Sequence, residues 1–362
     1  FQNQRGVGGR VLRLKLGELL EVAGVGHHGG VLLEGVELVH AVIILRRRLR
    51  LSWRYSLFMQ SFTPKKILIL GGSGFVGRHV CSRLSLQHHQ VTVPTRRLPA
   101  RHIQMMPGVS VVQANVHDAK QLQALVHGHD LVINLIAILH GTEDEFNQAH
   151  VTLPANLARA CHAENVTRLI HISALGADVH GPSMYQRSKA RGELALQSAA
   201  QKAPLGLTLL RPSVIFGKDD QFINLFASLQ KVFPFMPLAG AHTRFQPVWV
   251  HDVAQAIVHC VNTPSTEGQV FELCGPDILT LTELVQLAGR WVGKERPVIS
   301  LPYAIGWLQA LLMEWAPGKT LMSRDNLDSM KVHNVAIGHL PGLRALGVSE
   351  PKSIKRLFVA GK

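Results

Sequence analysis

The most constraining feature of this 362-residue sequence is a glycine-rich turn that directly follows an apolar run. Residues 67–77 read ILILGGSGFVG, with glycines at 71, 72, 74 and 77. In a strand-to-helix turn with this spacing, Gly71 or Gly72 allows the tight turn, Gly74 lets the backbone approach a pyrophosphate, and Gly77 lets the helix pack closely on the strand. The helix N-terminus adds free N–H groups. We therefore predict a dinucleotide site that consists of Gly71, Ser73, Gly74, Phe75, Val76 and Gly77. The alternative is a glycine turn with a purely structural role.

Short apolar runs alternate with helical patterns from residue 65 to about residue 215. The predicted strands cover 67–70, 91–93, 109–113, 131–135, 168–173 and 207–210, and the predicted helices cover 78–86, 121–126, 147–163 and 188–201. This alternation predicts an α/β fold with a doubly wound parallel Rossmann sheet. The less regular remainder predicts a Pro-rich loop at 233–237, a helix at 250–262 and a strand near 269–274. These elements are expected in a smaller C-terminal α/β lobe that closes over the strand ends, where open α/β sheets bind ligands.

Residues 1–58 differ in composition from the rest of the chain. They contain no Met, Pro, Asp or Cys, and the first methionine is Met59. We interpret 1–58 as an atypical extension that derives from an over-extended reading frame. A targeting segment is the alternative, because the stretch is rich in arginine but also carries four glutamates. The predicted organisation is a Rossmann domain over 59–217 and a C-terminal substrate or partner lobe over 218–362.

Charge and cysteine pattern narrow the classes of partner. Of the formal charge of +14, +5 lies in residues 1–58, and the remaining excess is spread along the chain without runs of basic residues interleaved with aromatic ones. This pattern favours an acidic membrane surface or partner protein over nucleic acid. The four cysteines are far apart and the histidines lack HExxH spacing, so we predict free thiols and no metal.

The apolar stretch 301–315 is too short to span a bilayer and predicts a buried or interfacial amphipathic helix.

Tyr185 and Lys189 have the Y-x-x-x-K spacing of an acid–base pair. Four residues on a helix make about one turn, so the phenol and the ammonium share a face. The lysine is expected to lower the pKa of the tyrosine and so make it a proton donor or acceptor. Lys189 can also hold a cofactor ribose, and the alternative is that both residues hold the cofactor without catalysis.

Together these features resemble the short-chain dehydrogenase/reductase superfamily, in its extended and atypical branches, over about 65–355. Residues 70–77 resemble the family's T-G-x-x-G-x-x-G, residues 211–217 its R-P-x-x-x-x-G, and residues 246–253 its P-V-x-V-x-D-V. The resemblance implies further cofactor contacts beside the adenine, after the fourth strand and after the sixth strand. The residues concerned are Asn115, Val116, Leu135, Ala137 and Pro212.

Segments 220–228, 246–248, 323–327 and 339–347 give a closer resemblance. They look like the nucleotide-binding accessory subunit of respiratory complex I, the 39-kDa type, and its bacterial relatives, some of which are linked to ubiquinone biosynthesis. The resemblance implies a tightly held NADPH, a structural or assembly role, and partners in complex I or quinone biosynthesis at the membrane. The implied location is the cytoplasmic side of the plasma membrane in a bacterium and the matrix side in a mitochondrion.

The segment after the fifth strand departs from the pattern of active short-chain enzymes, which usually carry a Ser or Thr that polarises the substrate carbonyl. Residues 171–176 read HISALG, so Ser173 is the only hydroxyl and the catalytic position can fall on Ala174 or Leu175. Two hypotheses follow. One is a structural NADP(H)-binding protein, and the other is an NADP-dependent reductase or epimerase with Ser173, Tyr185 and Lys189 as catalytic residues.

Cofactor preference is predicted from the end of the second strand. Enzymes that use NAD place an acidic residue there to bind the ribose 2′-hydroxyl. This chain reads VPTRR at 93–97, without an acid. Arg96 and Arg97 suit a 2′-phosphate, because the guanidinium fork matches phosphate oxygens. We expect NADP(H) over NAD(H), with a solvated basic loop as the alternative.

Overall fold

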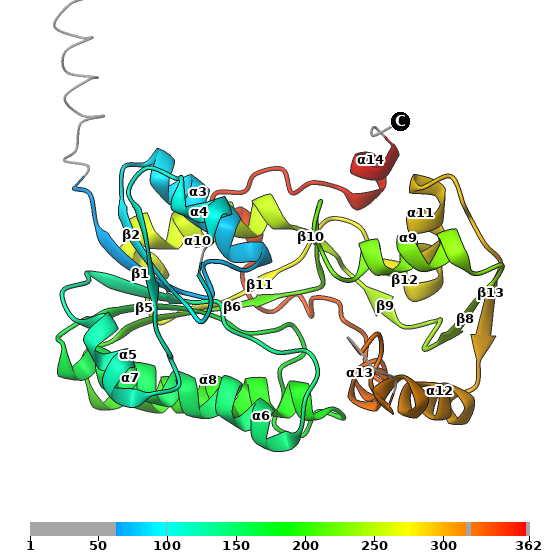
Figure 1. Ribbon diagram of the computed structural model, residues 1–362, viewed down its shortest axis with the longest axis horizontal. Coiled ribbons are helices and arrows are strands. Elements are labelled where there is room, and N and C mark those ends of the chain that lie inside the picture. The colour runs from blue at the N-terminus through cyan, green and yellow to red at the C-terminus, as the bar shows by residue number, and fades with distance from the viewer. Residues whose placement is uncertain (1–62, 99, 316–319, 360–362) are drawn as a thin grey trace, which may run out of the picture. The chain divides into compact units, whose positions relative to one another are not determined.

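The computed structural model describes residues 63–98, 100–315 and 320–359, and residues 64–362 form one compact unit (Figure 1). The predicted extension 1–58 lies outside the described residues. A central parallel sheet of seven strands has the order β11-β6-β5-β4-β1-β2-β3. The predicted Rossmann architecture is confirmed. The strands are β1 (Lys66–Leu70), β2 (Gln90–Thr95), β3 (Val109–Gln113), β4 (Leu131–Asn134), β5 (Arg168–Ile172), β6 (Gly206–Pro212) and β11 (Val270–Leu273).

The strand order changes direction at β1, which pairs with β2 on one side and β4 on the other. In an open α/β sheet, such a switch point is where ligands bind, beyond the carboxyl ends of the strands. The glycine turn follows β1 and therefore lies at this position. The seventh strand, β11, comes from the segment that sequence reasoning placed in the C-terminal lobe.

Alternating side chains of β1 pack into two separate hydrophobic cores, one on each face of the sheet. Ile67 and Ile69 pack in one core with α3 and α10, and Leu68 and Leu70 pack in the other with α5, α7 and α8. Figure 1 shows these two helical layers on opposite sides of the sheet. The helices are α3 (Phe75–Leu86), α4 (Arg101–Gln104) and α10 (Val250–Asn262) on one side, and α5 (Ala119–Val126), α6 (Glu143–Asn147), the π-helical turn η1 (Gln148–Thr152), α7 (Leu153–Ala163) and α8 (Met184–Lys202) on the other.

A third hydrophobic core lies outside the two layers, and Ile223, Leu238 and Leu284 are buried in it. The Pro-rich segment 233–237 was predicted as a loop, but its end starts β8, which pairs with β13. No helix in the described part of the chain is long and apolar enough to cross a membrane. The remaining elements of the described residues are β7 (Ile215–Phe216), α9 (Ile223–Val232), β8 (Met236–Ala239), β9 (Arg244–Phe245), β10 (Val248–Trp249), η2 (Pro264–Thr266), β12 (Leu279–Thr280), α11 (Leu281–Trp291), β13 (Val298–Leu301), α12 (Tyr303–Trp315), α13 (Arg324–Ser329), η3 (Leu343–Leu346) and α14 (Ile354–Val359).

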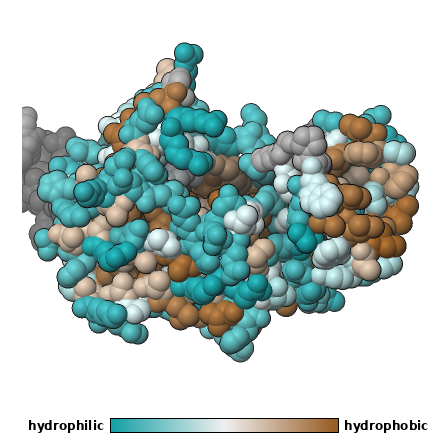
Figure 2. Space-filling model, turned by 60° about the horizontal axis from the view of Figure 1, so that its bottom comes forward, coloured by the Kyte–Doolittle hydropathy of each residue, from teal (hydrophilic) through white to brown (hydrophobic). Residues whose placement is uncertain are grey.

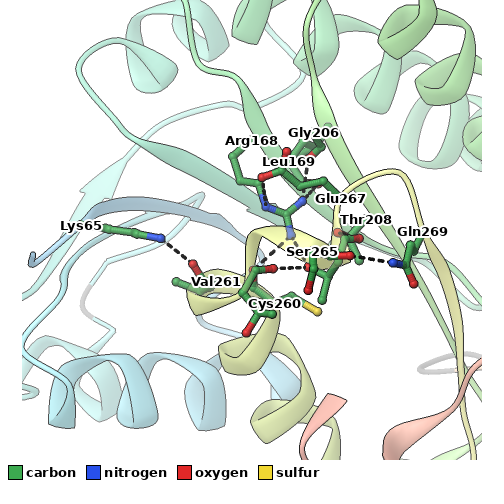
Figure 3. Close-up of polar contacts among 12 residues, drawn as sticks. Lys65, Arg168, Leu169, Gly206, Thr208, Cys260, Val261, Ser265, Glu267 and Gln269 are labelled. Carbon is green, nitrogen blue, oxygen red and sulfur yellow. Dashed lines mark hydrogen bonds and ion pairs between the residues drawn. The ribbon is translucent and has the colours of Figure 1, made fainter. Parts of the chain in front are cut away.

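A buried guanidinium at the amino end of β5 joins β6, α10 and η2 (Figure 3). Arg168 donates hydrogen bonds to the carbonyl of Gly206 at 2.6 Å, to the carbonyl of Cys260 at 3.1 Å and to Oγ1 of Thr266 at 2.9 Å. The Glu267 carboxylate lies 3.7 Å from its Nε. Buried acceptors in three elements therefore depend on one side chain.

We expect Arg168→Met to lower the free energy of unfolding by roughly 3 kcal/mol, because buried acceptors that lose their donor cost about 1–3 kcal/mol each. Urea unfolding measures the change. The matched control is Arg344→Met, whose side chain is exposed and whose effect is expected within about 0.5 kcal/mol. An equal loss in both variants would show that Arg168 has no special structural role.

Candidate functional site

The turn between β1 and α3 has a backbone that only glycine accommodates well. Gly71 has a φ of +80°, in the left-handed region that favours glycine. A Cβ on Gly77 would overlap the carbonyl oxygen of Gly71 and the backbone of Gly72, so α3 packs directly against the turn only because residue 77 has no side chain. Gly74 is the N-cap of α3 and supplies no side-chain cap. The first N–H groups of a helix have no intrahelical acceptor, which leaves them for an anion.

The residues around this helix start are open to a ligand. Gly74 is exposed, and Ser73, Phe75 and Val76 are partly exposed. The Ser73 carbonyl lies 3.1 Å from Nε2 of His102. We call residues 71–77 the cradle, because residues 73–76 are at least partly exposed beside helix N–H groups that have no intrahelical acceptor.

The end of β4 lies against the glycine turn. The N–H of Leu135 donates to the carbonyl of Leu70 at 2.9 Å, and a Cβ on Gly71 would lie 3.2 Å from the carbonyl carbon of Leu135. Asn134, the last residue of β4, is fully buried, and Ala137 is exposed. The structure thus brings Leu135 to the turn, and Ala137 follows on the surface.

Two predicted groups lie at the ends of β2 and β3, which are paired. Arg96 and Arg97 follow β2 and are exposed. Burial, and then the positive charge of Arg96, lower the pKa of His117, so this guanidinium is close to the loop after β3. Asn115 and the buried Val116 belong to that loop. The predicted phosphate-binding and adenine-binding residues are therefore neighbours.

The predicted catalytic residues lie at the end of β5 and on the first turns of α8. The ammonium of Lys189 is buried and donates to the carbonyl of Ile172 at 2.8 Å, and burial lowers its pKa to about 8. Burial raises the pKa of Tyr185 to about 12, so the expected lowering of this pKa by the lysine is wrong because desolvation dominates. The Oγ of Ser173 is buried and has no hydrogen-bond partner among the described residues.

A buried imidazole beside Tyr185 was missed by sequence reasoning. Nε2 of His150 accepts from the N–H of Ile138 at 3.1 Å, so Nδ1 carries the proton and donates to Oγ of Ser188 at 2.9 Å. The Ser188 hydroxyl in turn donates to the carbonyl of Tyr185 at 2.9 Å. Burial, and then the charge of Lys189, lower the pKa of His150 to about 3. His150 lies in the π-helical turn η1, a feature that often marks functional sites but has no spacing signature in sequence.

The helix α13, from the C-terminal part of the chain, accepts hydrogen bonds from the start of α8. The carboxylate of Asp325 accepts from the backbone N–H of Met184 at 2.5 Å and from that of Tyr185 at 3.1 Å. The neighbouring Asn326 donates to the carbonyl of Leu139, after β4, at 3.2 Å. Segment 323–327 carried the resemblance to the accessory subunit, but its contact with the helix that bears Tyr185 could not be inferred from sequence.

A second C-terminal residue joins the ends of β5 and β6. Asn334 donates to the carbonyl of Leu175 at 3.2 Å and accepts from Oγ of Ser213 at 2.6 Å. Pro212, the last residue of β6, is buried and accepts from the N–H of Leu175 at 2.9 Å. The C-terminal segments therefore contact the carboxyl ends of the central strands.

The site fits a nicotinamide dinucleotide by its cradle and its donors. Residues 73–76 are at least partly exposed at the start of α3. Lys189 uses one of its three ammonium donors on Ile172, and the Ser173 hydroxyl has no partner among the residues that the structure describes. Bound there, the cofactor would supply a hydride donor or acceptor. Among the described residues, no group of three or more His, Cys, Asp or Glu side chains could hold a metal ion, and the four cysteines are free thiols.

Comparison with known proteins agrees with this geometry. Residues 67–274 match the NAD dependent epimerase/dehydratase family. The chain is 31% identical to mitochondrial NADH dehydrogenase (ubiquinone) 1 alpha subcomplex subunit 9 of Mus musculus, over 80% of this chain and 78% of that protein. It is 27% identical to the ceramide reductase of Caulobacter vibrioides, over 65% of this chain and 73% of that protein.

The solved structures give the same fold. The UDP-glucose 4-epimerase of Thermus thermophilus, in complex with NAD, matches with a TM-score of 0.56 at 20% identity, over 74% of this chain and 99% of that chain. The match of the family model to residues 67–274 shows that the chain belongs to the NAD dependent epimerase/dehydratase family, whose members bind a nicotinamide dinucleotide. Within that family it is similar to the accessory subunits of the ubiquinone-linked NADH dehydrogenase.

We expect Gly74→Ala to weaken dinucleotide binding and Gly77→Ala to destabilise the fold. A methyl at 74 would lie 3.2 Å from the Gly71 carbonyl oxygen, a tight contact that a shift of a few tenths of an ångström relieves, whereas a methyl at 77 would overlap the backbone of the turn. The methyl at 74 also adds bulk at the start of the helix. We expect a rise of about tenfold or more in the Kd for dinucleotide with a nearly unchanged melting temperature. Gly77→Ala should lower the melting temperature itself. Calorimetry and thermal unfolding measure both, and unchanged affinity in Gly74→Ala would contradict the cradle.

Proposed function

We propose that the protein holds NADP(H) as a structural cofactor and serves as an accessory or assembly subunit of a quinone-linked respiratory complex at a membrane. The contact of Asp325 with the start of α8 carries this proposal. Through it, the C-terminal segment that resembles the accessory subunits contacts the helix that bears Tyr185 and Lys189, the two residues that we propose bind the dinucleotide. A bound cofactor then stabilises a unit that includes both lobes.

The similarity to mitochondrial NADH dehydrogenase subunits supports a place on the matrix side in a eukaryote and on the cytoplasmic face of the plasma membrane in a bacterium. Quinone-biosynthesis proteins are the other partners that we propose. A ligand at a hundred times its Kd stabilises a fold by about 2.7 kcal/mol, so a cofactor without turnover still has a physical role.

The electrostatics of the site support cofactor holding over catalysis. A general acid or base works best with a pKa near the working pH, whereas burial raises the pKa of Tyr185 to about 12. Lys189 binds the carbonyl of Ile172, so part of its donor capacity stabilises the β5–α8 contact. Tyr185 and Lys189 then hold the nicotinamide ribose.

Purification of the protein from its native membranes in mild detergent tests the proposal. We expect NADP(H) to remain bound at close to one per chain, and subunits of an NADH dehydrogenase to co-purify. Mass spectrometry of the extracted nucleotide and of the partners gives the result. A protein without nucleotide and without such partners would overturn the proposal.

The preference for NADP(H) is assigned to Arg96 and Arg97. We expect the Arg96→Glu, Arg97→Glu double variant to lose about tenfold or more of its affinity for NADPH, since a charge-assisted bond to phosphate is worth about 1.5–3 kcal/mol, while NADH binding changes little. Arg159→Glu, at an exposed position of α7, is the control. Equal binding of NADPH and NADH by the unaltered protein would contradict this assignment.

The second candidate function is an NADP-dependent reductase or epimerase. The observation that favours it is the buried Oγ of Ser173 without a partner, because an unpaired hydroxyl is available to a substrate carbonyl. The similarity to a ceramide reductase supports a reductase with a lipid-like substrate.

If the protein is such an enzyme, Tyr185→Phe should lower kcat for NADPH-dependent carbonyl reduction about a hundredfold or more while the Kd for NADPH stays within about threefold. Single-turnover absorbance at the nicotinamide band measures the rate. An unchanged rate in Tyr185→Phe would exclude this tyrosine as the proton donor.

A further inference from the structure

A set of exposed apolar side chains lies on α12, on β13 and on the segment 232–235 that ends α9 and leads into β8. Figure 2 shows a broad apolar area over this part of the molecule. We name it the α12 surface. It comprises Val232, Phe233, Phe235, Ile299, Tyr303, Ile305, Trp307, Leu308, Leu312 and Trp315.

Only a narrow strip of α12 packs against the protein. Its buried residues are Gly306 and Ala310, and a Cβ on Gly306 would overlap the side chain of Ala239 on β8. On the outer side, Leu308 is 52%, Leu312 is 59% and Trp315 is 78% exposed. Isolated exposed apolar residues need no explanation, but a continuous patch of this kind marks a membrane or protein contact.

The exposed side of α12 carries no unpaired charge, because the one acidic residue of this helix forms an ion pair with an arginine. Glu314 is half-buried and pairs with Nε of Arg324 at 2.9 Å. At the nearby start of α12, the carboxylate of Asp328 accepts from the Tyr303 hydroxyl at 2.6 Å and pairs with Lys331 at 2.7 Å. The carboxylates near the surface are therefore neutralised by adjacent groups.

The opposite end of the surface is basic. Nε of Arg296 donates to the carbonyl of Gln230 at 3.2 Å, so the loop before β13 lies beside the end of α9. Lys231 and Lys294, on these two segments, are exposed and pair with no carboxylate within the residues that the structure describes. The single acid of the loop, Glu295, pairs with Arg290 at 3.0 Å. The rim of the surface thus has a net positive charge.

We propose that the α12 surface docks on an anionic lipid bilayer, with α12 lying in the plane of the headgroups. An apolar helix face with aromatic residues and a basic rim is the combination that interfacial helices use, and Trp and Tyr are enriched at that depth. The helix has 13 residues, which is too short to span the hydrocarbon core but long enough to lie along it. The binding does not require the nucleotide and is a property of a different part of the chain.

Co-sedimentation of the full chain with vesicles tests the proposal. We expect binding to vesicles of phosphatidylcholine with about one-third phosphatidylglycerol, and weaker binding to phosphatidylcholine alone. The Leu308→Glu, Leu312→Glu variant should bind about tenfold more weakly or worse. The Leu86→Glu, Met105→Glu variant is the matched control, since these side chains are 77% and 87% exposed on the other lobe; its binding should be unchanged.

Two further measurements make the result specific. Brominated lipid should quench tryptophan fluorescence, and the Trp307→Phe, Trp315→Phe variant should lose that quenching. Lys231→Glu, Lys294→Glu should remove the preference for phosphatidylglycerol. Retention of NADP(H) by every variant separates this test from the proposed function.

Three outcomes would overturn the lipid assignment. The first is the absence of vesicle binding by the unaltered chain, and the second is equal binding by the unaltered chain and the Leu308→Glu, Leu312→Glu variant. In the third, this variant keeps vesicle binding but loses self-association or a co-purifying protein. The surface would then belong to a second copy or to a protein partner.

Discussion

The close contact between the glycine turn and α3 is the constraint on which the rest of the site depends. Because residue 77 has no Cβ, the first turn of α3 lies directly on the Gly71 carbonyl and the Gly72 backbone. This contact places the N-terminus of α3 beside the carboxyl end of β1. It also leaves Gly71 close enough for Leu135, at the end of β4, to complete the cradle. A side chain at 77 would separate helix from strand and remove the anion site together with the packing.

The second organising feature is the return of the C-terminal segments to the carboxyl ends of the strands. Asp325 caps the helix that carries Tyr185 and Lys189, and Asn334 joins the loops after β5 and β6. The same stretch connects to the α12 surface, because Arg324 pairs with Glu314 of α12. The dinucleotide site and the proposed membrane surface are therefore joined through a few residues of chain.

Much of the fold could be predicted from sequence. Helix 250–262 was expected from its apolar periodicity and has the same limits in the structure, and the first six strands were found in order. The seventh strand, β11, was expected as a strand of the C-terminal lobe, and it pairs with β6 of the central sheet. Its partner could not be read from the sequence because strand pairing is non-local. The contribution of Met236 to β8 was missed, since prolines at 234 and 237 suggested a loop and pairing with β13 overrides that local preference.

The sequence by itself determined the class of ligand and the class of fold. Glycine spacing and the alternation of apolar runs express local backbone requirements, and these can be recognised without neighbours. Only the tertiary structure decided the chemical state of the site. Burial, and not the spacing to Lys189, sets the pKa of Tyr185, and the tautomer of His150 follows from its bond to Ile138. Desolvation and hydrogen bonding come from residues distant in the chain, so no local pattern encodes them.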